Sequence, residues 1–181
     1  MFTTKYLEEL MERPLRSPVD FCSSLGLQAD PCQIEFMQRF AKLPQILDVK
    51  ADENFLLQKA AVLSTLWLCA TVEHARGIIL APSDDVAKSY MRFFEMLITK
   101  TTDGMRSMAK MKRWNVVEFC GNREWELRLL PNNVKIVEEH AKKAIFAMVV
   151  DAGCEETRFF EARKVLEATL EGSPSMLLRL W

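Results

Sequence analysis

The stretch Ile145-Phe-Ala-Met-Val-Val-Asp151 is a short apolar run that ends in an acidic residue. Its residues follow one another without a polar interruption, which is typical of a strand buried on both faces of a parallel sheet. Further strand candidates occupy residues 45–50, 77–81 and 176–181, and helical patterns lie between them. Because buried strands alternate with helices, the sequence predicts an α/β fold with a mostly parallel sheet flanked by helices.

Helix start signals precede the first of these strands. Ser17-Pro18 and Asp30-Pro31 each place an N-cap residue before a proline at the first helical position. We expect one helix to end before Gly26, its C′ residue, and the other to end near residue 42. Together with an earlier short helix they form an N-terminal helical segment over residues 1–44.

Helical patterns of two kinds occur in the α/β core, residues 45–181, of this single domain. From residue 55 to residue 71 the apolar residues are too dense for one stripe, so we expect a helix buried on more than one side. Ser83 can cap an amphipathic helix that runs to Lys100. The remaining helices are expected over residues 155–170 and in a short piece before Ala144.

Two runs in the core alternate apolar and polar residues. Residues 114–120 and residues 124–130 both show this period of two, and Gly121-Asn122 lies between them. The pattern predicts an antiparallel hairpin with one solvated face, inserted into the parallel sheet. The methionine-rich residues before this hairpin are expected to form a second helical piece.

The composition is that of a soluble globular protein. The 181 residues are 49% hydrophobic and 27% charged, and the formal net charge of −1 gives no global attraction to nucleic acid. The five cysteines form no Cys-x-x-Cys pair, so we expect no zinc site but reduced thiols in a cytoplasmic protein. The N-terminus has no signal-peptide pattern and no apolar stretch is long enough to span a bilayer, so no membrane partner is expected.

In this order, the elements resemble the N-terminal ATPase domain of phage large terminase subunits, the motors that pump DNA into viral heads. Residues 16–33 look like the segment that precedes the adenine pocket in that family, where the pattern is Asp-Pro-Trp-Gln. Cys32 stands at the tryptophan position, and Gln33 matches the glutamine that reads adenine. Residues 66–71 look like the end of the helix after the phosphate loop, and residues 77–83 are similar to the next strand with its Ala-Pro-Thr/Ser turn. The resemblance implies a P-loop NTPase (RecA-like) core.

The residues that would bind the phosphates depart from this pattern. A phosphate loop needs glycines so that its backbone N–H groups can wrap the phosphates, and a lysine and a hydroxyl to hold phosphate and Mg²⁺. The corresponding residues 49–59 contain no glycine, and Asp52 and Glu53 would repel a triphosphate. Lys59 could imitate the missing lysine, but it lies within the predicted helix and no serine or threonine follows it.

The acidic end of the quoted strand departs from the pattern as well. By resemblance, Asp151 takes the place of the Walker B aspartate, which a glutamate normally follows, but here Ala152-Gly153 follows. Asp151 could hold a metal, or it could be a strand-end acid that caps the next helix. Glu155 and Glu156 could be displaced catalytic residues or first-turn acids that complement the helix dipole.

Three further features could form contact surfaces. Basic residues gather before the predicted hairpin and Trp114 follows them, which suits a phosphate backbone; the alternative is a solvated helix end. Met105 and Met108 could form an adaptable docking face or fill an irregular core. Trp181 ends the last strand, which we expect to be an uncovered sheet edge for self-association or partner binding. The basic residues are Lys100, Arg106, Lys110, Lys112 and Arg113.

These observations predict a catalytically inactive, terminase-like protein that acts by binding. Gln33, Lys59 and Asp151 would be remnants of a nucleotide site, with Gln33 on the helix surface or in a cap, and we expect no catalytic residue, metal or cofactor. The partner would be phage packaging machinery or a second copy, in the host cytoplasm if the protein is phage-encoded, and no nuclease domain is expected. The alternatives are an unorthodox ATPase that uses Lys59, Asp151 and Glu155 or Glu156, and a DNA-binding module that uses the basic residues.

Overall fold

The structure is a computed structural model that describes most of the chain: residues 17–50, 56–71, 76–100, 109–113, 116–119, 125–130, 133–150, 156–171, 173 and 175–180. The helices are α2 (Pro18–Ser24), α3 (Pro31–Phe40), α4 (Leu56–Thr71), α5 (Asp84–Lys100), α7 (Val134–Ala141) and α8 (Thr157–Leu170). The strands are β1 (Ile46–Val49), β2 (Arg76–Leu80), β3 (Ala109–Arg113), β4 (Val116–Phe119), β5 (Trp125–Leu130), β6 (Phe146–Val150) and β7 (Met176–Leu180).

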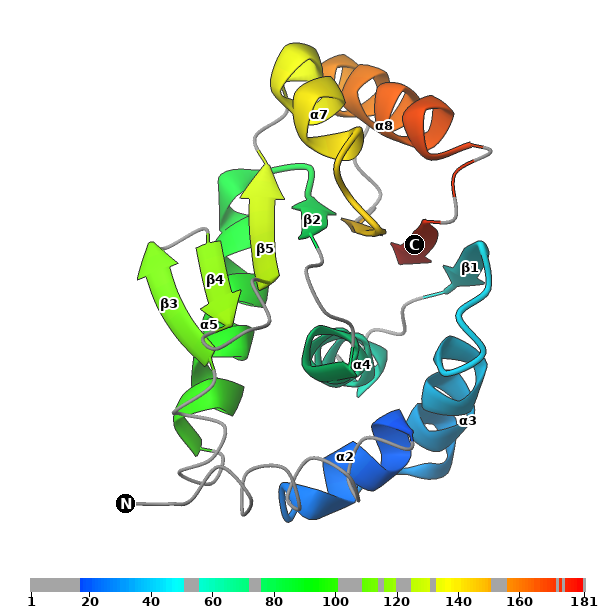
Figure 1. The fold of residues 1–181 in the computed structure, drawn as a ribbon, viewed down its shortest axis with the longest axis vertical. Coiled ribbons are helices and arrows are strands. Elements are labelled where there is room, and N and C mark those ends of the chain that lie inside the picture. The colour runs from blue at the N-terminus through cyan, green and yellow to red at the C-terminus, as the bar shows by residue number, and fades with distance from the viewer. Residues whose placement is uncertain are drawn as a thin grey trace.

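One sheet organises the described part of the chain, with its strands in the order β1-β7-β6-β2-β5-β4-β3 (Figure 1). Strands β1, β7, β6, β2 and β5 run parallel to one another, while β4 and β3 continue the sheet beyond β5 in antiparallel pairing. The strands that contain Ile78, Val149 and Leu178 lie side by side inside this sheet, as predicted. The mostly parallel α/β fold is therefore confirmed.

Helices cover both faces of the sheet. Figure 1 shows α2, α3, α4 and α5 on one side and α7 with α8 on the other. The buried strand β6 serves both layers, because Phe146 and Met148 belong to the core under α2–α5 while Ala147 and Val149 belong to the core under α7 and α8. Phe40 of α3 meets Phe146 edge-on, with ring centroids 5.9 Å apart. The quoted stretch of sequence is thus the centre of the molecule, as its unbroken apolar character predicts.

The two helices of the described N-terminal segment begin at the predicted residues. Ser17 caps α2, because its Oγ accepts a hydrogen bond from the N–H of Asp20 at 3.1 Å. Gly26 follows the helix with φ of 70°, in the left-handed region that favours glycine. Helix α3 starts in the same manner at Asp30-Pro31. Both helices then pack against α4.

The two longest described helices also follow their sequence patterns. Residues 60–68 of α4 are buried all round, which confirms the expectation of burial on more than one side. The Thr65 hydroxyl donates to the Ala61 carbonyl at 2.8 Å, so this polar group is satisfied inside the core. Ser83 caps α5, since its Oγ accepts from the N–H of Val86 at 3.3 Å. Within the described ranges, no helix combines the length and the apolar character needed to cross a membrane.

The last strand is not a sheet edge, and this prediction is wrong. Strand β7 lies between β1 and β6, with Leu178 level with Leu47 on one side and Met148 on the other. The reason is that β1, the first strand in the sequence, pairs on the outer side of β7. The apolar run of β7 is buried, as a strand inside a parallel sheet should be. Trp181 itself lies outside the described residues.

Residues 109–113 form a strand where the sequence analysis expects helix. Strand β3 pairs antiparallel with β4, and Met111 lies opposite Val117. In the run Ala-Lys-Met-Lys, apolar and basic residues alternate with a period of two, which is a strand pattern. The sequence analysis gave more weight to the many methionines and therefore expected a helix. Strand β4 in turn pairs antiparallel with β5, with Val117 opposite Leu127. The basic residues Lys110, Lys112 and Arg113 therefore belong to an edge strand and not to a helix end.

Candidate nucleotide site and contact surfaces

The carboxyl ends of the parallel strands meet at one edge of the sheet, which is where open α/β sheets bind ligands. Strands β1 and β6 lie on either side of β7, so their ends are about 10 Å apart at the usual strand spacing. The segments that leave these two ends, residues 51–55 and residues 151–155, contain Asp52, Glu53 and Asp151. All three lie outside the described residues. The described ends of β1 and β6 lie at this same edge.

Lys59 lies in the first turn of α4, directly after the segment that leaves β1. Its side chain is exposed, and the residue that follows it, Ala60, is fully buried. A phosphate-binding lysine is normally followed by a hydroxyl that holds Mg²⁺. Lys59 therefore lies inside the helix as predicted and can offer a positive charge but not the metal-holding group.

Gln33 closes a reciprocal cap at the start of α3. Its Oε1 accepts a hydrogen bond from the N–H of Asp30 at 3.1 Å, and its own N–H donates to Asp30 Oδ1 at 2.9 Å. Only 6% of Gln33 is exposed, so the capping interpretation is confirmed and the helix-surface alternative is wrong. To read adenine through this oxygen, the side chain would have to give up the capping box. Cys32, beside it, is exposed where the related pattern has tryptophan.

Glu156 occupies the N-cap of α8 and not the first helical turn. Its side chain makes no capping hydrogen bond, while its carbonyl accepts from the N–H groups of Phe159 and Phe160 at 3.0 and 3.2 Å. The carboxylate remains near the positive end of the helix dipole, as expected for an acid at this place. Glu155 lies outside the described residues.

The part of the chain that the structure describes contains no cluster of potential metal ligands. No group of three His, Cys, Asp or Glu side chains gathers there. Cys22 is buried, and burial raises the pKa of its thiol, which disfavours the reactive thiolate.

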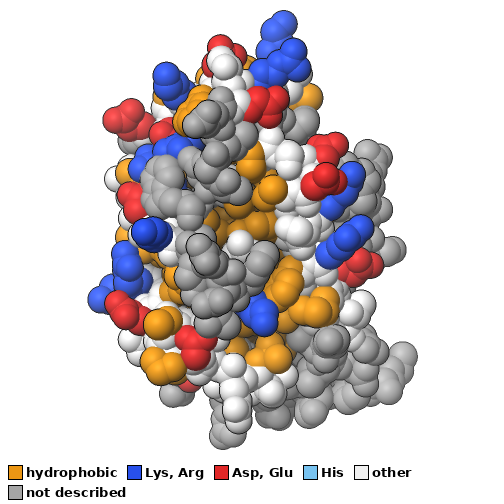
Figure 2. Space-filling model, turned by 180° about the vertical axis from the view of Figure 1, so that it is seen from behind, with side chains coloured by type: hydrophobic (Ala, Val, Ile, Leu, Met, Phe, Trp, Pro, Cys, Tyr) orange, Lys and Arg blue, Asp and Glu red, His pale blue; other side chains and the backbone are white. Residues whose placement is uncertain are grey.

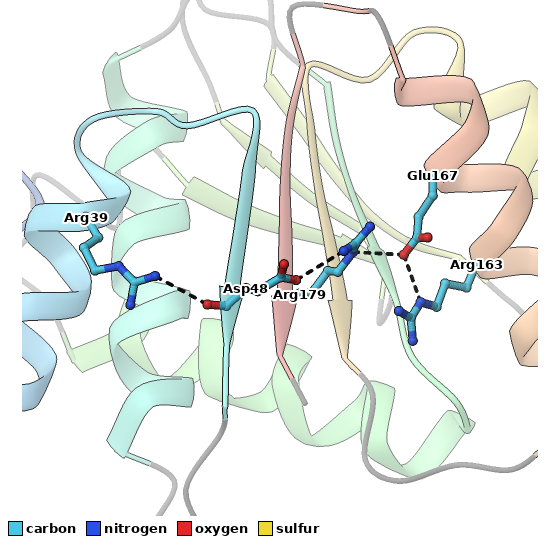
Figure 3. Close-up of polar contacts among 5 residues, drawn as sticks. All are labelled: Arg39, Asp48, Arg163, Glu167 and Arg179. Atoms are coloured by element: carbon cyan, nitrogen blue, oxygen red, sulfur yellow. Dashed lines mark hydrogen bonds and ion pairs between the residues drawn. The ribbon is translucent and has the colours of Figure 1, made fainter.

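A series of ion pairs connects α8, β7 and β1 (Figure 3). The sequence analysis did not predict it. Arg179 of β7 contacts Asp48 of β1 at 3.3 Å and Glu167 of α8 at 3.0 Å, and Glu167 also contacts Arg163 at 2.9 Å. Arg39 of α3 donates to the backbone carbonyl of Asp48 at 3.5 Å. The Arg163–Glu167 pair has the local i,i+4 spacing of a helix, but Arg179 and Asp48 are 131 residues apart, so no local pattern could have predicted the link between β7 and β1.

A groove of about 440 Å³ lies beside this series of ion pairs, on the side of the sheet that α8 covers. Its floor comes from β1 and β7, and its wall comes from α8. Ile46 is an exposed apolar residue of this lining, with half of its surface accessible to solvent. The lining residues are Gln45, Ile46, Lys164, Glu167, Ala168, Leu170, Glu171, Ser175, Leu177 and Arg179.

The predicted basic residues divide between two elements. Lys100 ends α5, while Lys110, Lys112 and Arg113 belong to β3, which packs next to α5. Arg106 lies outside the described residues, and so do the candidate docking residues Met105 and Met108. The described elements thus place three of the five basic residues on the strand at the edge of the sheet opposite β1.

Comparison with known proteins gives matches among solved structures. No family model and no curated protein matches the sequence. The ATPase domain of a Thermus phage large terminase matches with a TM-score of 0.63 at 16% identity, over 98% of this chain and 68% of that domain. A mutant of the same domain matches with a TM-score of 0.62 at 14% identity, over the same shares of both chains.

The fold is that of a phage large terminase ATPase domain. The HK97 bacteriophage large terminase also matches, with a TM-score of 0.62 at 11% identity over 85% of this chain. This chain spans 33% of that terminase and about two thirds of the Thermus phage domain. The resemblance drawn from the sequence is therefore confirmed for the fold.

Proposed function

We propose that this protein is a terminase-like pseudo-ATPase that acts by binding, as a regulator or scaffold of phage DNA packaging. The observation that supports the proposal most strongly is the segment between β1 and α4. The fold supplies the strand and the helix that a phosphate loop would join, but the joining residues 50–55 contain no glycine and include Asp52 and Glu53. Without glycines the backbone cannot wrap a triphosphate closely, and two carboxylates would repel it.

The structure around Gln33 adds independent support. A domain that reads adenine needs a side chain that is free to turn toward the base. Here the side-chain Oε1 of Gln33 accepts a hydrogen bond from the Asp30 N–H and the side chain is buried, so it stabilises α3 instead. A domain with the shape of a motor subunit can occupy a subunit interface without chemistry, and we infer that this shape is what the protein supplies to the packaging machinery.

A phosphate-release assay tests this proposal. Purified protein with ATP and Mg²⁺, with and without duplex DNA, should release no more phosphate than the Lys59→Ala variant. DNA-stimulated release that Lys59→Ala abolishes would overturn the proposal in favour of an unorthodox ATPase that uses Lys59 with Asp151 and Glu155 or Glu156.

One observation favours DNA binding as a second candidate function. Lys110, Lys112 and Arg113 belong to the edge strand β3, which packs next to α5, and a phosphate backbone could approach this edge. On the face shown in Figure 2, basic and acidic side chains of the described residues are interspersed, so any DNA contact would depend on a local patch.

The test of this second candidate is binding to a short labelled duplex at increasing salt. Joint replacement of the three basic residues of β3 by alanine should weaken salt-sensitive binding. The control is replacement of Lys142 and Lys143, two exposed lysines after α7, which should change it little. Equal effects of the two replacements would count against a specific patch.

A further inference from the structure

We draw no further inference here: the strongest candidate, the recess of about 400 Å³ that Lys135 and Arg158 line at the N-terminal ends of α7 and α8, rests on helix N-termini, and no second observation among the described residues points to a ligand there.

Discussion

Gln33 stabilises the start of α3 through its reciprocal hydrogen bonds with Asp30, at the residue where resemblance to terminases implies adenine recognition. The same side chain cannot fully serve both roles, because its carbonyl oxygen already accepts the Asp30 N–H. Gln33 therefore matches the terminase pattern in residue type, but its contacts are those of a helix cap. Sequence reasoning could predict the cap from Asp30-Pro31 and a glutamine three residues after the aspartate, which is the capping-box spacing.

Replacement of Gln33 by alanine tests this structural role. The change removes one capping hydrogen bond and leaves the Asp30 N–H without that partner, so the free energy of unfolding should fall by about 1 kcal/mol. Urea unfolding measures the difference. The matched control is Gln38→Ala on the exposed side of α3, which should stay within about 0.5 kcal/mol of wild type. Equal effects of the two changes would remove the capping box as a source of stability.

Tyr90 gives a prediction for alkaline pH. Its side chain is buried in the core under α2–α5, and its hydroxyl has no hydrogen-bond partner among the described residues. Burial raises the pKa of Tyr90 above its ordinary value, because the charged phenolate is poorly solvated there. The unfolded chain ionises first, so stability is present below about pH 10 and is lost as the pH rises through and above that value.

The measurement is urea unfolding of wild type and Tyr90→Phe at several pH values from about 8 to about 11. Other groups titrate in this range, so the quantity to compare is the difference between the two proteins. Wild type should lose stability relative to Tyr90→Phe as the pH rises. A constant difference across the range would show that Tyr90 is not the group responsible.

At the scale of elements, β7 is an inner strand of the sheet, although the sequence analysis expects it at an edge, and β1 is the edge strand beside it. The chain order makes the last strand look like an edge, but β1 pairs outside it. The ion pairs of Arg179 with Asp48 and Glu167 join α8, β7 and β1 across this arrangement. These side chains are partly exposed, so each pair contributes modestly and their main effect is to fix the position of the edge strand.

Amide hydrogen exchange tests the assignment of β1 as the edge strand. The N–H groups of Leu47 and Val49 should exchange slowly, because the ladder with β7 begins at the Gln45 carbonyl and uses alternate residues of β1. The N–H groups of Ile46 and Asp48 should exchange much faster, because they face solvent at the edge. Resonance-resolved exchange by NMR measures all four amides in one experiment. Slow exchange at Ile46 and Asp48 would show that another strand already covers β1.

At the scale of the whole molecule, the sequence predicts the helices and the inner strands because their signals are local. Proline after an N-cap residue marks α2 and α3, and the unbroken apolar run before Asp151 marks β6. The order of strands and the ion pairs of Arg179 depend on contacts between distant residues, which no local pattern encodes. The strand at residues 109–113 did carry a local signal, an alternation of lysines that the methionine content obscured.

Our central claim is that this protein has the shape of the motor domain but does not bind nucleotide. It rests on the terminase-like fold and on the absence of glycine between β1 and α4. We expect the fold to need no ligand for its stability, because buried apolar cores lie on both faces of the sheet. A ligand at a hundred times its dissociation constant would add about 2.7 kcal/mol to the free energy of unfolding, which is easily seen as a rise in Tm.

The most direct test is therefore the melting temperature of the protein with and without millimolar ATP and Mg²⁺. Our account predicts the same Tm in both conditions, for wild type and for Lys59→Ala alike. A clear rise in Tm with ATP for wild type that is lost in Lys59→Ala would contradict it, because it would show that residues 50–59 still form a nucleotide site.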